Sequence, residues 1–278
     1  MSTELLSFRG CDSSRQKADI VLLGAPLDAS GKTAAGPDAI RRGSRGLESF
    51  SLCQGRDLSG CPVWDAGDLA PGEQDAALDR LEKAVSDLSG RGKLPFLLGG
   101  PGPVTLGAVR GLAGKYPRLH LIQFAAHAGL RPTDGGNDRA CVMRRCYELL
   151  GEGKIHQFCI RSGVREEFAF ALKHTDMHPF NFGWLEPTVH GLIREQVPVY
   201  LSIALDCLDP SELPGTEFPE AGGLRFSEVL EAALAVCRTH VVGVDVTELA
   251  PDPGGISAAA AAKLVREILI ALSAGKNL

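Results

Sequence analysis

Short, mostly apolar runs recur along the chain, each bounded by glycine, proline or charged residues. They are nearly continuous in apolar character, whereas a strand with one wet face alternates between apolar and polar residues. The runs therefore predict buried strands of a parallel sheet that is covered on both faces. The predicted strands are Ile20–Leu23, Pro95–Leu98, Leu119–Phe124, His156–Ile160, Val199–Ile203 and Val241–Val246.

Helical spacing of apolar positions fills the stretches between these runs. Asp75–Leu88, Thr105–Leu112 and Phe226–Cys237 are typical of helices that bury one face. A last helix is predicted to begin at Ser257 as its N-cap. Charged residues follow its alanine run 258–262, so this helix is interpreted as an amphipathic surface helix. Its apolar face carries Leu264, Ile268 and Leu272, and its charges are Lys263, Arg266 and Glu267.

Alternation of strands and helices predicts the α/β class, with a central, mainly parallel sheet wound on both sides. No repeat, low-complexity tract or linker divides the sequence, so residues 1–278 are expected to form a single domain. In such sheets ligands collect beyond the carboxyl ends of the strands. Four segments that follow predicted strands are candidates: Gly99–Val104, Ala125–Arg131, Ala204–Pro210 and Thr247–Pro251.

The composition and charge of the chain argue against some classes of binding partner. The net charge of -5, with no stripe of lysine or arginine, argues against a nucleic-acid surface. No apolar run approaches the roughly 18 residues of a membrane span, and residues 1–14 lack the apolar core of a signal peptide. The eight cysteines form no C-x-x-C pair. We therefore expect a cytoplasmic protein with reduced thiols and neither a nucleic-acid nor a membrane partner.

The candidate segments carry longer motifs. Residues 202–210 read S-I-A-L-D-C-L-D-P, residues 214–223 read P-G-T-E-F-P-E-A-G-G, and residues 243–251 read G-V-D-V-T-E-L-A-P. These resemble, in order, the S-x-D-x-D-x-x-D-P, P-G-T-G-T-P-E-x-G-G and G-x-D-V-V-E-x-x-P elements of the ureohydrolases. That family contains the arginases, agmatinases and formiminoglutamases, and the likeness is closest to bacterial agmatinases. The resemblance implies the three-layer α/β/α arginase-like fold and a homo-oligomer.

Near the amino terminus, residues 24–28 read G-A-P-L-D and residues 36–41 read G-P-D-A-I-R. Both resemble family motifs. The segment between them is shorter than in the family and lacks its R-P-G loop, which puts substrate access in question.

The resemblance also implies a dinuclear manganese site whose shared hydroxide attacks a guanidinium carbon. The family supplies two histidines and four aspartates from its G-G-D-H, D-x-H-x-D and S-x-D-x-D motifs. Here only His127 and Asp206 match those six positions. The other four ligand positions are occupied by Gly102, Ala125, Gly129 and Ala204. The sequence therefore predicts that most of the metal site is lost and that no cofactor is bound, apart from weak residual binding of a divalent ion such as manganese.

Two interpretations of the remaining polar residues stay open. His127 and Asp206 are either remnants held by hydrogen bonds, or ligands of a single ion with help from Glu248 or from Asp134 and Asp138. Glu248 matches the family's carboxylate for the substrate guanidinium, and Arg139 falls where the family has a substrate-side histidine. Glu248 either grips a guanidine or amine ligand or pairs with Arg139 or another internal cation.

Other features have simpler explanations. Residues 99–103 read G-G-P-G-P, and the two prolines remove donors that an anion cradle would use, so a tight strand-to-helix turn is expected. Cys207 is expected to be a buried structural thiol, and Asp209 and Asp245 are expected to make loop or strand-end hydrogen bonds and to take no part in chemistry.

Three functional hypotheses follow. The first is a catalytically inactive ureohydrolase homologue that binds a small guanidine or amine, or acts as a regulatory subunit in a mixed oligomer with a paralogue. The alternative is a hydrolase of linear amidine C–N bonds that releases urea from agmatine or another guanidine with an altered or mononuclear metal site. A metal-free enzyme built in the old cavity is the third.

Overall fold

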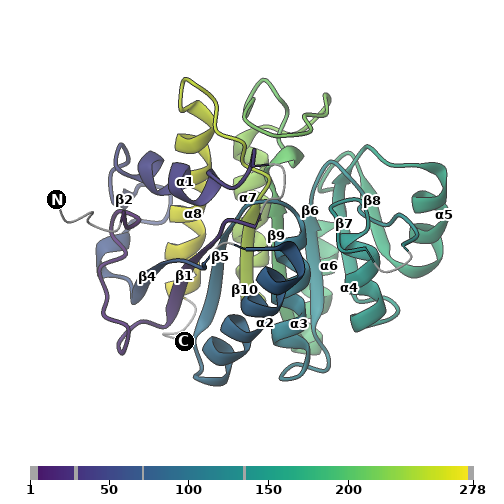
Figure 1. Ribbon diagram of the computed structural model, residues 1–278, viewed down its shortest axis with the longest axis horizontal. Helices are drawn as coiled ribbons and strands as arrows, with labels where there is room; N and C mark the ends of the chain where they lie inside the picture. Colours follow the sequence, from purple (N-terminus) through teal and green to yellow (C-terminus); the bar gives the residue numbers. More distant parts are fainter. Residues whose placement is uncertain (1–5, 28–30, 71, 134–135, 275–278) are drawn as a thin grey trace.

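The computed structural model describes residues 6–27, 31–70, 72–133 and 136–274. Eight strands form its central sheet, and every hydrogen-bonded pair in that sheet is parallel. The strands are β1 (Ile20–Ala25), β4 (Val63–Asp68), β5 (Leu94–Gly99), β6 (His120–Phe124), β7 (Ile155–Ile160), β8 (Asp176–Pro179), β9 (Pro198–Ala204) and β10 (His240–Thr247). Their spatial order is β4-β1-β5-β10-β9-β6-β7-β8 (Figure 1). A separate antiparallel ribbon joins β2 (Phe50–Ser51) to β3 (Arg56–Asp57).

Two layers of helices cover this sheet. One layer contains α2 (Gln74–Gly90), α3 (Pro103–Ala113) and α4 (Val142–Leu150), and α2 packs along α3 (Figure 1). The other contains α1 (Gly36–Ser44), α6 (Leu185–Glu195), α7 (Phe226–Val236) and α8 (Ile256–Ala274), with α8 between α1 and α7. A further helix, α5 (Arg165–His174), lies beside β8.

The buried side chains divide into one hydrophobic cluster for each helical layer. Successive strand residues point to opposite faces of the sheet. Thus Phe96 belongs to the cluster beneath α8, and its neighbour Leu97 belongs to the cluster beneath α2 and α3. Both residues are fully buried. This arrangement confirms the predicted three-layer α/β/α fold and explains why the strand sequences are apolar on both faces.

All six predicted strands are present in the central sheet, but two other strands of that sheet were missed. Both β4 and β8 are edge strands of the sheet, and their sequences, V-W-D-A-G-D and D-M-H-P, are too polar to stand out as buried runs. An edge strand needs no second strand beside it and is only partly covered, so the apolar pattern that predicts central strands is absent.

The predictions for the last helix were partly wrong. It begins at Ile256, so Ser257 lies inside it. Instead, the Asp252 carboxylate accepts hydrogen bonds from the N–H groups of Ile256 and Ser257. The helix is also not a surface helix, because Arg266 and Glu267 are buried and hydrogen-bonded to each other. In the sequence, the charged residues of a buried ion pair look the same as those of a solvent-exposed helix face.

The G-P-D-A-I-R segment forms α1, and its arginine ties that helix to the edge of the sheet. Arg41 Nε and Nη2 donate to the two carboxylate oxygens of Asp65 at 2.8 and 2.9 Å, and Nη1 donates to Asp68 at 2.5 Å. Arg41 and Asp65 are almost fully buried, with side chains 3% and 1% exposed. The pair therefore fixes α1 against β4 through bidentate, charge-assisted hydrogen bonds.

Candidate functional site

The four candidate segments converge because their strands are neighbours. The strands β5, β10, β9 and β6 lie side by side at the centre of the sheet, and all run in the same direction. Their carboxyl ends therefore open at one edge. The backbone joins them there, since the N–H of Glu248 donates to the carbonyl of Gly100 at 2.9 Å. Gly99–Pro103 is a strand-to-helix turn, as predicted, with Pro103 as the first residue of α3.

His127 and Asp206 form one unit across the ends of β6 and β9. His127 Nδ1 donates to Asp206 Oδ2 at 2.8 Å, and the N–H of Ala126 donates to Asp206 Oδ1 at 2.9 Å. The Asp206 side chain is 3% exposed and that of His127 is 23% exposed. Each oxygen of this carboxylate already accepts one protein hydrogen bond, so Asp206 is stable in its position without a ligand.

Glu248 enters the same pocket from the end of β10. One carboxylate oxygen accepts the N–H of Gly102 at 2.7 Å, and the residue is 3% exposed. Burial and the nearby Asp206 charge raise the pKa of Glu248 to about 8, although the Arg139 charge opposes this shift. No described cation approaches within ion-pair distance of it. The backbone of Glu248 is left-handed, with φ of 68°, a strained conformation for a residue with a side chain.

Arg139 lies at the wall of this pocket and does not form a close pair with Glu248. Its guanidinium carbon sits 3.7 Å above the centre of the Phe218 ring, a cation–π contact. Arg139 therefore acts on Glu248 through its charge alone, and the direct ion pair that the sequence left open as one alternative is not formed between these two residues.

The four positions without metal-ligating side chains, Gly102, Ala125, Gly129 and Ala204, all line one pocket. A Cβ atom placed on Gly102 would lie 3.3 Å from Glu248 Oε1 and make ordinary contacts with Arg139 Cγ at 3.6 Å and Val142 Cγ1 at 3.7 Å. Ala125 and Ala204 are buried in the hydrophobic cluster beneath α2 and α3. The cavity between Asp206, His127, Glu248 and Arg139, here called the inner pocket, has a volume of about 20 Å³. That is room for about one water molecule.

Beneath the inner pocket lies a hydrogen-bond network that the sequence did not reveal. Thr105 and Ser202 hydroxyls are 3.0 Å apart, Ser202 donates to Asp245 at 2.8 Å, and Tyr200 donates to the same carboxylate at 2.7 Å. Burial raises the pKa of Asp245 to about 6. Asp245 thus makes hydrogen bonds, as predicted, and its partners are side chains of the neighbouring strand β9. Thr105 also lines the inner pocket. Its role as a site residue could not be predicted, because it lies in an apolar helical sequence.

A second cavity adjoins the first along His127, Gly129 and Arg139. This outer pocket has a volume of about 130 Å³ and is lined by two arginines, Arg131 and Arg139, together with Glu167. Glu167 is buried, and its two oxygens accept the N–H groups of Leu130 and Val164, both at 2.8 Å. The sequence analysis missed Arg131 and Glu167, because nothing in their local pattern marks them.

The loop after β9 is fixed by Arg161. Its guanidinium donates to the carbonyls of Asp206 at 2.8 Å and Glu220 at 2.6 Å. Asp209 accepts hydrogen bonds from the Ser211, Gly222 and Gly223 N–H groups, which confirms its predicted loop role. Cys207 is fully buried, and burial raises the pKa of its thiol, as expected of a structural cysteine.

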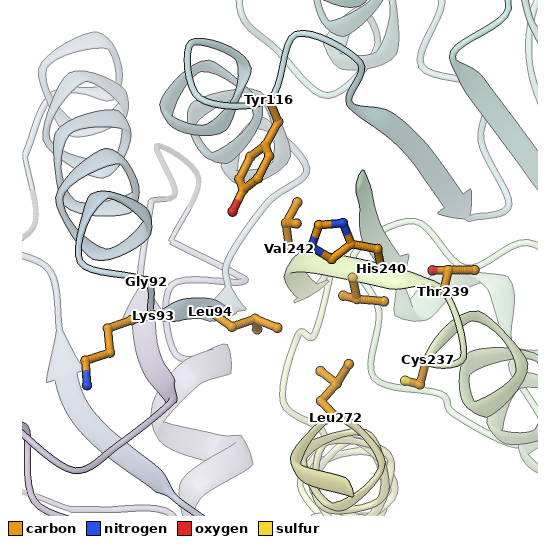
Figure 2. Close-up of a pocket in the computed structure, with 10 residues that line it drawn as sticks. Gly92, Lys93, Leu94, Tyr116, Cys237, Thr239, His240, Val242 and Leu272 are labelled. Atoms are coloured by element: carbon orange, nitrogen blue, oxygen red, sulfur yellow. The ribbon is translucent and has the colours of Figure 1, made fainter. Parts of the chain in front are cut away.

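A larger hollow, of about 340 Å³, lies at the opposite end of the sheet, at the start of β5 and β10 (Figure 2). Figure 2 shows Tyr116, His240 and Val242 around it, while the Lys93 side chain runs away from it. The Lys93 amine donates to the backbone carbonyls of Gln16 and Ala18. No carboxylate lines this hollow among the described residues. It therefore lacks the chemistry of the strand-end site.

The described donors do not fit two metal ions. No group of three or more histidine, cysteine or carboxylate side chains in the described part of the chain is placed to hold one. The inner pocket offers one imidazole and two carboxylates, and a pair of ions sharing a hydroxide needs more donors and more space than one water molecule occupies. Asp138 instead caps its own turn through the Ala140 N–H, and Asp134 lies outside the described residues.

Comparisons with known proteins agree with the fold and the motifs. The model of the arginase family matches residues 18–271, so the chain belongs to the arginase family. It is 37% identical to the agmatinase of Bacillus anthracis over 92% of this chain and 93% of that protein. It is also 37% identical to an N(1)-aminopropylagmatine ureohydrolase of Thermococcus kodakarensis over 90% and 89% of the two chains. The agmatine ureohydrolase structure of Thermoplasma volcanium superposes with a TM-score of 0.89 at 29% identity, covering 99% and 97%.

These comparisons confirm the predicted ureohydrolase resemblance and its agmatinase character. Across the described ranges, no helix has the length and apolar content needed to cross a membrane. The predicted oligomer, the mixed oligomer with a paralogue and the cytoplasmic location stay predictions.

Proposed function

We propose that this ureohydrolase-family chain binds a small guanidine or amine cation at the inner pocket without forming a dinuclear manganese site. The observation that carries the proposal is Glu248, a buried carboxylate aimed at the pocket from a strained backbone position. Among the described residues, one backbone N–H, that of Gly102, donates to it. A buried carboxylate without a paired cation is costly, and a guanidinium supplies that cation through two parallel hydrogen bonds.

Space in the pocket shapes this proposal. A planar guanidinium needs more room than the inner pocket offers. The partly exposed side chain of Arg139 forms one wall of the inner pocket. An outward shift of this side chain would supply the room that a guanidinium needs. The same narrowness leaves little space for an unrelated metal-free reaction, which weakens the third hypothesis.

The relatives favour the hydrolase alternative. Proteins 36–37% identical to this chain bear the name agmatinase, and nothing in the comparisons indicates an inactive chain. If the chain hydrolyses a guanidine, the retained His127, Asp206 and Glu248 are the residues on which turnover depends. Binding without hydrolysis is preferred here because the described donor set does not fit the ions that the family's reaction uses.

Metal content separates the two functions directly. We expect protein expressed with excess manganese and then desalted to hold fewer than about 0.1 ion per chain, because the few described donors bind a divalent ion weakly. Elemental mass spectrometry measures this, with Bacillus subtilis agmatinase carried through the same steps as a control. One or two ions per chain, or urea release from agmatine or arginine, would overturn the proposal in favour of the hydrolase.

Cation affinity should rise with pH. The pKa of Glu248 is raised to about 8, so the carboxyl is mostly protonated at pH 7 and must lose its proton when a guanidinium binds. Affinity for butylguanidine is therefore expected to increase about tenfold from pH 7 to pH 9 and to level off above pH 8. Calorimetry in two buffers of different ionisation enthalpy should detect release of about one proton at pH 7. A flat profile would show that Glu248 does not contact the cation.

A further inference from the structure

The inner and outer pockets differ in their charged groups. Two carboxyl groups, those of Asp206 and Glu248, line the inner pocket, and Arg139 lines both pockets. The outer pocket is lined by two guanidinium groups and one carboxylate, that of Glu167. The two cavities meet along His127, Gly129 and Arg139, so one small molecule can extend through both.

The carboxylate of the outer pocket is already compensated. Both oxygens of Glu167 accept backbone N–H groups, and Arg131 Nε lies 3.7 Å from one of them. Arg139 has its guanidinium over Phe218 and makes no ion pair with a described carboxylate. The outer pocket therefore keeps a net positive charge, with the Arg131 side chain 55% exposed and available for a ligand.

This charge disfavours a ligand that is cationic at both ends. Agmatine is a butylguanidine that ends in an ammonium group. If its guanidinium lay at Glu248, its ammonium would face Arg131 and Arg139, and like charges within one small cavity repel. A carboxylate at the same place would accept charge-assisted hydrogen bonds from the arginine forks.

We infer that Arg131 and Arg139 form a carboxylate-binding subsite, and that the natural ligand is a zwitterion with a guanidine or amine at one end and a carboxylate at the other. The inference rests on the proposed function, because the inner pocket must hold the cationic end. It deepens that function by naming the ligand class, a short ω-guanidino or ω-amino acid. Arg131 and Arg139 would determine specificity by selecting the end of the ligand that faces solvent.

Four probes of one chain length test the inference by calorimetry at pH 8: butylguanidine, butanoate, 4-guanidinobutanoate and agmatine. We expect 4-guanidinobutanoate to bind at least about tenfold more tightly than butylguanidine, and agmatine to bind more weakly than butylguanidine. In Arg131→Gln the preference for the carboxylate should fall to about threefold or less, with butylguanidine affinity unchanged. Arg165→Gln, the same change at an exposed α5 position outside the outer pocket, should keep the full preference.

The outcomes separate the subsite from the proposed function. Equal affinity for butylguanidine and 4-guanidinobutanoate, or tightest binding of agmatine, overturns the subsite and leaves cation binding intact. Binding of butanoate but not butylguanidine supports the subsite and overturns the proposed function. Binding of none of the four probes overturns both. Thermal unfolding of Arg131→Gln checks that loss of the Glu167 contact has not unfolded the loop.

Discussion

Replacing Arg41 with methionine should destabilise the protein by about 3–5 kcal/mol, because it leaves the buried Asp65 carboxylate without its cation. Asp65 is 1% exposed, and its two oxygens accept four hydrogen bonds from described residues, two from Arg41 and one each from the Phe8 and Gly67 N–H groups. Methionine keeps most of the volume of the side chain, so the loss reports on charge and not on a cavity. Urea unfolding followed by circular dichroism measures it.

The next residue along α1 provides the control. Arg42 also pairs with an aspartate, Asp38, at 2.6 Å, but its side chain is 72% exposed. Arg42→Met should therefore cost far less stability than Arg41→Met, because exposed ion pairs contribute little. If the two variants lose similar stability, the Arg41 contact is not the attachment of α1 to the sheet edge that the structure indicates.

Replacing Glu248 with glutamine should have opposite effects on stability and on binding. The pKa of Glu248 in the folded chain, about 8, lies above the ordinary value of 4.5. Ionisation therefore lowers stability as pH rises from about 4.5 to 8, and the loss is complete above pH 8. Glutamine can still accept the Gly102 N–H but carries no charge. At pH 9 we expect Glu248→Gln to be about 2–4 kcal/mol more stable than the parent, and at pH 5 to differ by less than about 1 kcal/mol.

The same substitution should weaken butylguanidine binding by at least about a hundredfold at pH 9, since the amide offers no charge and only one acceptor atom. Urea titrations at both pH values and calorimetry at pH 9 measure the two effects. Glu231→Gln, at an exposed position on α7, should change neither. A variant that is less stable than the parent at pH 9, with unchanged binding, would refute the role given to Glu248.

The sequence predicted the centre of this fold better than its edges. The central strands are covered on both faces, so burial alone imposes an apolar run such as Phe96 and its neighbours. Edge strand β4 carries Asp65 and Asp68, and both pair with Arg41, which the fold brings beside them. A local sequence pattern cannot predict this ion pair, because it joins residues of two elements that are not adjacent in sequence.

Only those residues of the candidate site that follow the ends of strands or belong to family motifs could be predicted from the sequence. His127, Asp206, Glu248 and Arg139 were named from segments that follow strands and from the family motifs, and the structure places all of them at one pocket. The surroundings of Gly102, made by Glu248, Arg139 and Val142, could not be predicted, because they depend on how α4, the loop before it and the end of β10 pack. Glu167 was missed for a related reason, since its hydrogen bond to the Leu130 N–H joins α5 to a loop that is distant in sequence.

The hydrogen bonds that join the strand ends also bear on how quickly a ligand can be taken up. Asp206 to Ala126, Glu248 to Gly102, and Arg161 to the loop carbonyls connect the rim of the pocket without any ion. A ligand thus meets a rim that is already organised, so little of its binding free energy is spent on ordering the backbone. Association should then be governed by encounter and by the swing of one arginine side chain, a motion on the nanosecond scale, and not by a slow closure of the loops.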